Sequence, residues 1–319
     1  MVEISVVVPI YNGEPCLQEL VCQITKALRN HPHELIFVED QSTDDSWGEI
    51  QRLCKTEPNL VGIRLRKNAG QDSAILCGLR QARGRFCVIL DDDLQHDPQD
   101  ILTLYAQCQK NDLDVCYAHF PARKHSWWKR AGSWLNGKLA EIVIAKPKHL
   151  YLSPFKIMRQ EIATEIIKYT GAFPYVDGLI LAVTHNIGQV EVTHHARYKG
   201  ESTYGMAKSL VVFMRVATGF SVWPLRLSTC IGMVCSMGAF ALALFYLAQY
   251  ARNGHRVEGW ITIVILQLLL GGLGLVSVGM VGEYLGRLYL NSNGKPQATI
   301  KEVCGGSNLR GRGTTHDPL

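Results

Sequence analysis

Several common signatures are missing from this chain of 319 residues. No GxGxxG motif follows its first strand-like segment, and no GxxxxGK followed by Ser or Thr occurs anywhere, which disfavours a dinucleotide oxidoreductase and a P-loop NTPase. The ten cysteines form no CxxC pair and no Cys/His cluster with zinc spacing. Because several of them lie inside apolar runs, we interpret them as reduced core residues in a reducing compartment.

Little net charge is present either: the formal value is +5 at pH 7. This is too weak to indicate binding to nucleic acid, but it suits a protein that lies against an anionic membrane surface. The N-terminus begins with strand-like sequence, without the basic, apolar and small-residue stretches of a signal peptide. We therefore expect no cleaved secretion signal.

Charge is absent altogether from two long apolar stretches, residues 227–248 and 260–282. At about 1.5 Å per helical residue, each can cross a hydrocarbon core of about 30 Å; the alternative is a pair of buried helices in a soluble protein. The linker, residues 252–258, is short, so we expect a transmembrane hairpin. It carries two arginines, whereas residues 197–226 and the chain after the second stretch each carry five Lys or Arg. The positive-inside rule then places both ends, and the domain that precedes the hairpin, in the cytoplasm.

The first 120 residues alternate between strand-like and helix-like segments. This alternation predicts an α/β fold with a doubly wound, mostly parallel sheet. In such sheets, ligands bind at the carboxyl ends of the strands. Strands are expected at Ile4–Pro9, Glu34–Glu39, Leu60–Leu65, Phe86–Leu90 and Asp114–His119.

Three consecutive carboxylates, Asp91, Asp92 and Asp93, follow the apolar run of the fourth expected strand. So much negative charge at the mouth of a core strand is unfavourable unless a cation neutralises it, and Mg²⁺ takes such oxygen ligands. The alternative is a solvated turn that caps the next helix. Polar residues Asn12, Asp40 and Asn68 also follow strands, and this coincidence favours a functional site.

Residues 123–148 interleave basic residues with tryptophan, a composition typical of a segment at a membrane interface. An ordinary amphipathic surface helix is the alternative. Residues 206–226 contain a second amphipathic stretch. We thus expect a domain over 1–205, a juxtamembrane helix over 206–226, the hairpin over 227–285, and a tail over 286–319 whose end is disordered.

Six motifs in this order resemble the family-2 inverting glycosyltransferases with a GT-A fold. Together with the hairpin they are similar to the bacterial polyprenyl-phosphate glycosyltransferases, a group with undecaprenyl-phosphate aminoarabinosyl and glucosyl transferases and dolichol-phosphate mannose synthases. The resemblance covers about residues 3–303. The motifs are Val7–Asn12, Val38–Asp44, Lys67–Ala74, Asp91–Gln95, Arg197–Tyr204 and Gly282–Arg287.

The resemblance implies that a sugar passes, with inversion, from a nucleotide sugar to undecaprenyl phosphate on the cytoplasmic face of a bacterial inner membrane. The lipid-linked product would serve cell-envelope glycan modification. UDP is favoured over GDP, and glucose, N-acetylhexosamine, mannose and aminoarabinose all remain open. A homotetramer is also implied, and glycines at 271, 272, 274, 282 and 286 permit close helix packing.

Site residues follow from the same resemblance. Asp91 and Asp93 match the family's DxD motif and would hold Mg²⁺ or Mn²⁺ against the diphosphate, with Asp92 at the variable position between them. Asp40 would accept a hydrogen bond from the base, with a helix cap as its alternative role. Gln95 would lie near the acceptor phosphate. The other expected nucleotide-sugar contacts are Pro9, Tyr11, Asn12, Asn68, Gly70, Gln71 and Asp92.

Contacts to the acceptor are expected from basic and hydroxyl side chains. Arg197 and Ser202 would close over a phosphate group from a loop before the membrane. For Arg123 and Lys124, snorkelling at the membrane interface is an equal alternative. The expected acceptor-phosphate residues are Arg123, Lys124, Ser153, Lys156, Ser202 and Tyr204.

One departure from the family concerns the general base. Where many relatives carry an aspartate, this chain has Leu150. A phosphate monoester is mostly a dianion at pH 7, so it needs positioning and charge balance more than deprotonation. We therefore expect no dedicated base, with Asp177 as a weaker candidate. A catalytically silent nucleotide-sugar-binding or assembly protein is the alternative; a processive synthase would need a QxxRW-type motif and more membrane helices.

Overall fold

The computed structural model describes residues 2–120, 147, 150–192, 223–253, 260–294 and 296–305. The chain forms two compact units. The first comprises Met1–Glu141, Ala145–Thr203 and Gly294–Leu319, and the second comprises Ile142–Ile144 and Tyr204–Asn293. The last described segment therefore returns to the unit in which the chain began.

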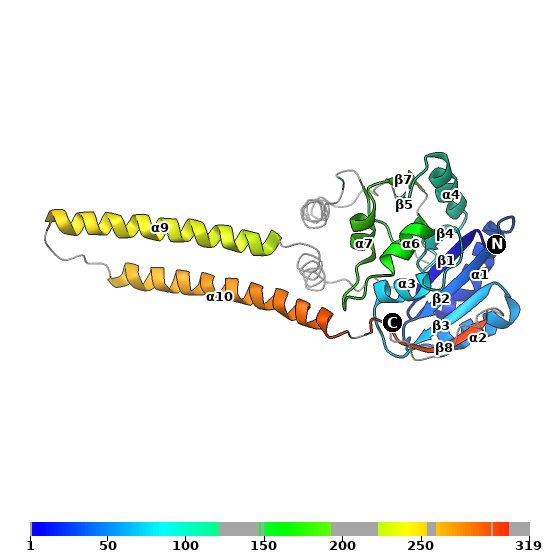
Figure 1. Cartoon of the computed structure of the whole chain (residues 1–319). Coiled ribbons are helices and arrows are strands. Elements are labelled where there is room, and N and C mark those ends of the chain that lie inside the picture. The colour runs from blue at the N-terminus through cyan, green and yellow to red at the C-terminus, as the bar shows by residue number, and fades with distance from the viewer. Residues whose placement is uncertain are drawn as a thin grey trace. The chain divides into compact units, whose positions relative to one another are not determined.

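The first unit is built on an eight-stranded mixed sheet with the order β7-β5-β6-β4-β1-β2-β3-β8 (Figure 1). Its central strands β4, β1, β2 and β3 are parallel neighbours. β6 runs antiparallel to both β4 and β5, and β8 runs antiparallel to β3. The strands are β1 (Ile4–Ile10), β2 (His33–Glu39), β3 (Leu60–Leu65), β4 (Phe86–Ile89), β5 (Val115–His119), β6 (Lys156–Arg159), β7 (Ile187–Glu191) and β8 (Ile300–Gly305).

Helices cover both faces of this sheet, and β1 shows how. Val6 and Val8 belong to one core cluster with Leu17 of α1 (Glu14–Ala27). Val7 points to the other face, where Gly78 of α3 (Gln71–Leu79) packs so closely that an added Cβ would lie 2.4 Å from its side chain. The remaining helices of this unit are α2 (Ser46–Thr56), α4 (Asp100–Lys110), α6 (Gln160–Ile166) and α7 (Val176–Val183).

Local sequence explains why these elements form. Every residue of β1 is buried, as expected for a β-branched run in a parallel strand covered on both faces. α1 has a proline in its first turn, an acidic residue at its start and Lys26 in its last turn, all of which suit the helix ends. Burying each large aliphatic side chain of its inner face contributes about 1.5–3 kcal/mol.

The five expected strands are confirmed, with end points within two residues. Three further strands were not expected. β6 carries a lysine, and β7 and β8 are only partly buried, so none of them is a continuous apolar run. The expectation that 286–319 is a tail is wrong for 300–305, because these residues form β8 at the sheet edge.

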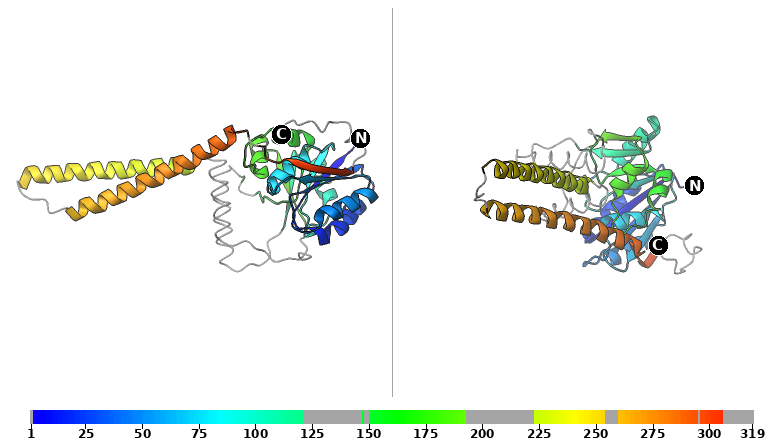
Figure 2. Two further views of the ribbon diagram at one scale, coloured as in Figure 1. Left: turned by 90° about the horizontal axis from the view of Figure 1, so that it is seen from below. Right: turned by 60° about the vertical axis from the view of Figure 1, so that its left-hand side comes forward.

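The second unit contains two long helices, α9 (Trp223–Asn253) and α10 (Trp260–Ser292), which run side by side (Figures 1 and 2). Both expected helices are therefore confirmed, and each is longer than its uncharged stretch. In the described part of the chain, one helical stretch, Leu269–Ser292, is long and apolar enough to cross a membrane. Ser228–Leu242 is apolar but shorter. That both helices span a membrane stays a prediction.

Candidate active site

The carboxyl ends of β4, β1 and β2 lie next to one another, because these strands are parallel neighbours. The chain leaves β1 at Tyr11 and β4 at Leu90, and the two loops that follow are in contact: the Tyr11 backbone N–H donates to Oδ2 of Asp92 at 3.3 Å. A Cβ added to Gly13 would lie 2.4 Å from that oxygen. A larger residue at Gly13 would therefore displace the Asp92 carboxylate where the first loop passes the acidic triplet.

Asn12 fastens the loop after β1 to the loop after β2. Its side-chain oxygen accepts from the Thr43 backbone N–H at 2.8 Å and from the Thr43 hydroxyl at 3.1 Å. In return, the Asn12 N–H donates to the Ser42 hydroxyl at 3.1 Å, and the Gly13 N–H donates to the Ser46 hydroxyl at 3.1 Å. Asn12 itself is left-handed, with φ of 57°, a conformation that asparagine tolerates well.

Asp40 is buried directly after β2 and organises a third loop. Its two carboxylate oxygens accept from the backbone N–H groups of Ala69 at 2.6 Å and Gly70 at 2.8 Å. Asn68 donates through its amide to the Asp40 carbonyl at 3.0 Å. Burial raises the pKa of Asp40, against the opposing effect of the two N–H groups.

These contacts bear on the two expected roles of Asp40. It does not cap α2, whose N-cap residue is Asp45; instead it holds the segment that leads into α3. Each carboxylate oxygen can still accept a second hydrogen bond, so the contact with a base stays a prediction. Gly70, with φ of 87°, adopts a conformation that favours glycine.

The acidic triplet lies among hydrogen-bond donors at the end of β4. Gln71 donates through its amide to Oδ1 of Asp91 at 2.7 Å, and the Gln95 N–H donates to Oδ1 of Asp93 at 3.2 Å. Burial raises the pKa of Asp92 to about 7, and the carboxylates of Asp91 and Asp93 add to this effect. The next helix, α4, begins at Asp100 and has no side-chain cap, so the triplet does not act as its cap.

The carboxylate oxygens of Asp91 and Asp93 suit a divalent cation that also binds phosphate. Among the described residues, no group of three or more His, Cys, Asp or Glu side chains is arranged to hold a metal ion. Mg²⁺ is commonly held by one or two carboxylates together with substrate phosphates and water. Burial is the main cause of the raised pKa of Asp92, and a cation there would offset the further contribution of Asp91 and Asp93.

A second polar cluster is buried at the same edge of the sheet. Lys156 of β6 lies opposite Ile89 of β4 and opposite Tyr117 of β5. Its ammonium group forms an ion pair with Asp177 in the first turn of α7. Tyr117 donates to the same Asp177 oxygen at 2.9 Å. Burial, and then Asp177, raise the pKa of Tyr117 well above its ordinary value.

Asp72 links this cluster to the triplet. It follows Gln71 at the start of α3 and accepts from the Val176 N–H at the start of α7 at 3.0 Å. Burial raises the pKa of Asp72. Neither Asp72 nor Tyr117 was expected as a site residue from the sequence. Asp72 lies within the motif Lys67–Ala74, which could have revealed it, whereas Tyr117 stands in an apolar strand and gives no signal.

The remaining expected residues divide into three groups. Pro9 is buried in β1 and Tyr11 is 52% exposed. Ser153 is buried, and its hydroxyl accepts from the Phe155 N–H at 3.2 Å. Lys156 is also buried and pairs with Asp177, so neither side chain lies at the surface. Their contact with an acceptor stays a prediction, as do all the assigned roles. Arg123, Lys124, Arg197, Ser202, Tyr204 and the segments 123–146 and 206–222 lie outside the described residues.

The mixed sheet with an acidic triplet at the end of β4 defines a GT-A-like domain. Residues 5–167 match the model of Glycosyl transferase family 2, and the chain belongs to this family. It is therefore a glycosyltransferase, as its motifs indicate.

Named relatives extend over nearly the whole chain. The undecaprenyl-phosphate 4-deoxy-4-formamido-L-arabinose transferase of Proteus mirabilis is 28% identical over 308 residues, which are 95% of this chain and 94% of the relative. The uncharacterized glycosyltransferase YkcC of Bacillus subtilis is 28% identical over 312 residues, 97% of this chain and 96% of that protein.

A solved structure is similar in fold. Glucosyl-3-phosphoglycerate synthase from Mycobacterium tuberculosis, in complex with Mn²⁺, UDP and glucosyl-3-phosphoglycerate, superposes with a TM-score of 0.52. The match covers 68% of this chain and 77% of that chain at 18% identity. At this identity the likeness concerns the fold alone.

Proposed function

We propose that this glycosyltransferase moves a sugar from a UDP-sugar to a polyprenyl monophosphate, with inversion, at the cytoplasmic face of a bacterial inner membrane. The observation that carries the proposal is the edge formed by Asn12, Asp40 and the acidic triplet. Three loops meet there, and backbone N–H groups and carboxylates are already ordered by one another. The name of the Proteus mirabilis relative supports undecaprenyl phosphate as the acceptor.

The donor would bind along this edge. Asp91 and Asp93 are the residues that would hold Mg²⁺ or Mn²⁺ beside the diphosphate, and a bound cation would stabilise the negative charge of the leaving UDP. The Mn²⁺ and UDP in the neighbour's complex support this assignment. Asp40 would accept from the base through its remaining lone pairs, and the exposed ring of Tyr11 is available for stacking.

Reaction with the acceptor would be a single displacement. An oxygen of the phosphate dianion forms the bond to the anomeric carbon while the bond to UDP breaks, so the configuration inverts. Because the dianion is already deprotonated near pH 7, no base is needed. Lys156 and Tyr117 both direct their donors at Asp177, which supports a positioning role for this carboxylate.

The two long helices would anchor the enzyme as a hairpin. Several large apolar side chains on them are exposed in the structure, among them Val234, Leu275 and Val278. Lipid would cover such side chains favourably. Glycines 271, 272 and 274 have no atom within 4 Å of an added Cβ, which supports close packing against another helix, including one from a second copy in a tetramer.

A substrate panel tests the proposal. Full-length protein in nanodiscs is incubated with undecaprenyl phosphate, Mn²⁺ and UDP- or GDP-linked glucose, N-acetylhexosamine, mannose or aminoarabinose. We expect transfer of one sugar from a UDP donor, with inverted configuration in the lipid product. Nucleotide binding without transfer from any donor would instead favour the silent binding protein.

A further inference from the structure

β8 follows α10 in the chain, yet it lies beside the loops of the candidate donor site. It pairs with β3 so that Glu302 stands opposite Arg64 and Cys304 stands opposite Gly62. Side chains alternate along β8: Glu302 and Cys304 are partly buried, whereas Lys301 and Val303 are exposed. Glu302 therefore faces α2 from a strand that is remote in sequence.

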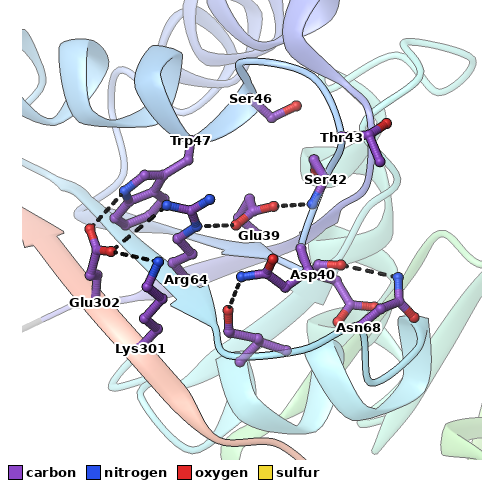
Figure 3. A network of polar contacts seen from close by, with 12 residues as sticks. Glu39, Asp40, Ser42, Thr43, Ser46, Trp47, Arg64, Asn68, Lys301 and Glu302 are labelled. Carbon is purple, nitrogen blue, oxygen red and sulfur yellow. Dashed lines mark hydrogen bonds and ion pairs between the residues drawn. The ribbon is translucent and has the colours of Figure 1, made fainter.

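Glu302 gathers three donors (Figure 3). Its Oε2 accepts from the indole N–H of Trp47 at 3.0 Å, and its Oε1 lies 3.7 Å from the Arg64 guanidinium and 3.4 Å from the Lys301 ammonium. The Trp47 hydrogen bond is the main cause of a lowered pKa at Glu302. The Arg64 guanidinium also lies over the Trp47 ring, 5.8 Å from its centroid. Glu302 thus connects two side chains that otherwise meet only through this stacking.

Arg64 carries the connection to a buried carboxylate. Its Nε donates to Oε2 of Glu39 at 3.1 Å, and the Glu39 side chain is only 1% exposed. A buried carboxylate is costly unless it is paired and hydrogen-bonded. The other oxygen of Glu39 accepts from the Ser42 backbone N–H, and the Ser42 hydroxyl accepts from the Asn12 N–H. The contacts from Glu302 therefore reach the loop at the donor edge.

Trp47 reaches the same loop at its other end. It follows Ser46, whose hydroxyl accepts from the Gly13 N–H, in the first turn of α2. The loop Gln41–Ser46 is thus held near its start by Glu39 and near its end by the helix that carries Trp47. Arg64, which pairs with Glu39, and Trp47 of this helix both contact Glu302.

We propose that Glu302 is a positioning residue for the donor: through Arg64 and Trp47 it orders the loop Gln41–Ser46 and, with it, Asn12. The inference rests on the proposed function, because it takes this loop to bind the nucleotide sugar. Removing Glu302 leaves Arg64 to Glu39 alone and frees the Trp47 indole. Donor binding must then order the loop, which weakens binding without changing the displacement step.

The test compares Glu302→Ala, Glu302→Gln and Val303→Ala in full-length protein. Gln keeps an acceptor for Trp47 but removes the charge that faces Arg64. Val303 is on the same strand, is 50% exposed and faces away from the loop, so it is the matched control. We expect the donor KM, and the Kd for UDP with Mn²⁺, to rise roughly three- to tenfold in Glu302→Ala. In Glu302→Gln both constants should lie between those of wild type and Glu302→Ala, and in Val303→Ala they should equal the wild-type values. In all three variants kcat should stay within about twofold of wild type.

Hydrogen exchange of the ligand-free protein separates this inference from the proposed function, because it needs no substrate. The Ser42 amide, which donates to Glu39, is expected to exchange several-fold faster in Glu302→Ala and at the wild-type rate in Val303→Ala. Wild-type exchange in both glutamate variants, or a lower kcat at unchanged donor KM, would overturn the inference. Faster loop exchange in an enzyme that binds no nucleotide sugar would overturn the proposed function instead. If Glu302→Ala does not fold, Glu302→Gln decides.

Discussion

Two carboxyl groups at the same edge of the sheet, Asp92 and Asp177, have opposite surroundings. Asp92 is flanked by two carboxylates, and burial together with these two charges raises its pKa to about 7. Asp177 receives the ammonium group of Lys156 and the hydroxyl of Tyr117. The region of Asp92 accumulates negative charge, whereas in the region of Asp177 a lysine of the same fold neutralises the carboxylate. The first is therefore suited to an external cation, and the second to holding its neighbours in place.

The sharpest way to break this comparison is Asp93→Asn, which removes a charge from the acidic region. If that region holds the cation beside the diphosphate, transfer should fall roughly a hundredfold or more. Sugar transfer to undecaprenyl phosphate measures the loss. Asp112→Asn is the matched control, since Asp112 is exposed and paired with Arg159. Substantial transfer by Asp93→Asn would rule out the proposed cation site.

Lys156→Met tests the neutralised region. The change leaves the Asp177 carboxylate buried beside Tyr117 without its cation, so we expect the free energy of unfolding to fall by about 3–5 kcal/mol. Denaturant unfolding of the detergent-solubilised protein measures it. The double variant Lys156→Met with Asp177→Leu should recover much of the loss, because the uncompensated charge is gone. A stable single variant would mean that the ion pair contributes little.

Asp92→Asn sharpens the comparison through pH. The pKa of Asp92 is raised in the folded state, so its favourable contribution is complete below pH 4 and is lost as pH rises through about 7. In EDTA at pH 8, the variant should be more stable than wild type by on the order of 1 kcal/mol, with little difference at pH 4. Thermal unfolding at both pH values checks this, and Mn²⁺ should close the gap. A less stable variant at pH 8 would contradict the charge crowding.

The smallest effect on transfer is expected for Asp177→Asn, although the change leaves the buried Lys156 ammonium without its carboxylate partner. Its amide can still accept from Tyr117, and no base is required for a phosphate dianion. Transfer should stay within about tenfold of wild type, while the wild-type rate falls below pH 6 as the acceptor phosphate becomes protonated. A pH–rate profile of both proteins tests this. Complete loss of transfer with an intact fold would make Asp177 the base.

The central fold was predictable because its strands are continuous apolar runs. β1 and β3 bury nearly every residue, and such runs are visible in one sequence. β8 alternates buried and exposed residues at an edge, and β6 contains a charged residue whose partner lies in α7. Both depend on neighbours that are distant in the chain, and no local pattern reveals them.

The candidate site was predictable in part, for those residues that directly follow a predicted strand. Asn12, Asp40 and Asp91–Asp93 stand at strand ends, which is why a polar edge could be expected. The partners of Lys156 could not be expected from the sequence. Lys156 was expected to contact the acceptor phosphate, but the strand register buries it against Tyr117. Glu302 was also missed, since its contacts with Trp47 and Arg64 join residues more than two hundred positions apart.

The late position of β8 has a consequence for biosynthesis. The residues of the first unit are all synthesised only after both long helices have been made, because the edge strand beside β3 comes from residues 300–305. Until then the edge of β3 is unpaired, and an open edge invites pairing with other chains. A soluble fragment that ends before the helices keeps this open edge permanently. The nascent enzyme therefore finishes its sheet only after α9 and α10 have left the ribosome.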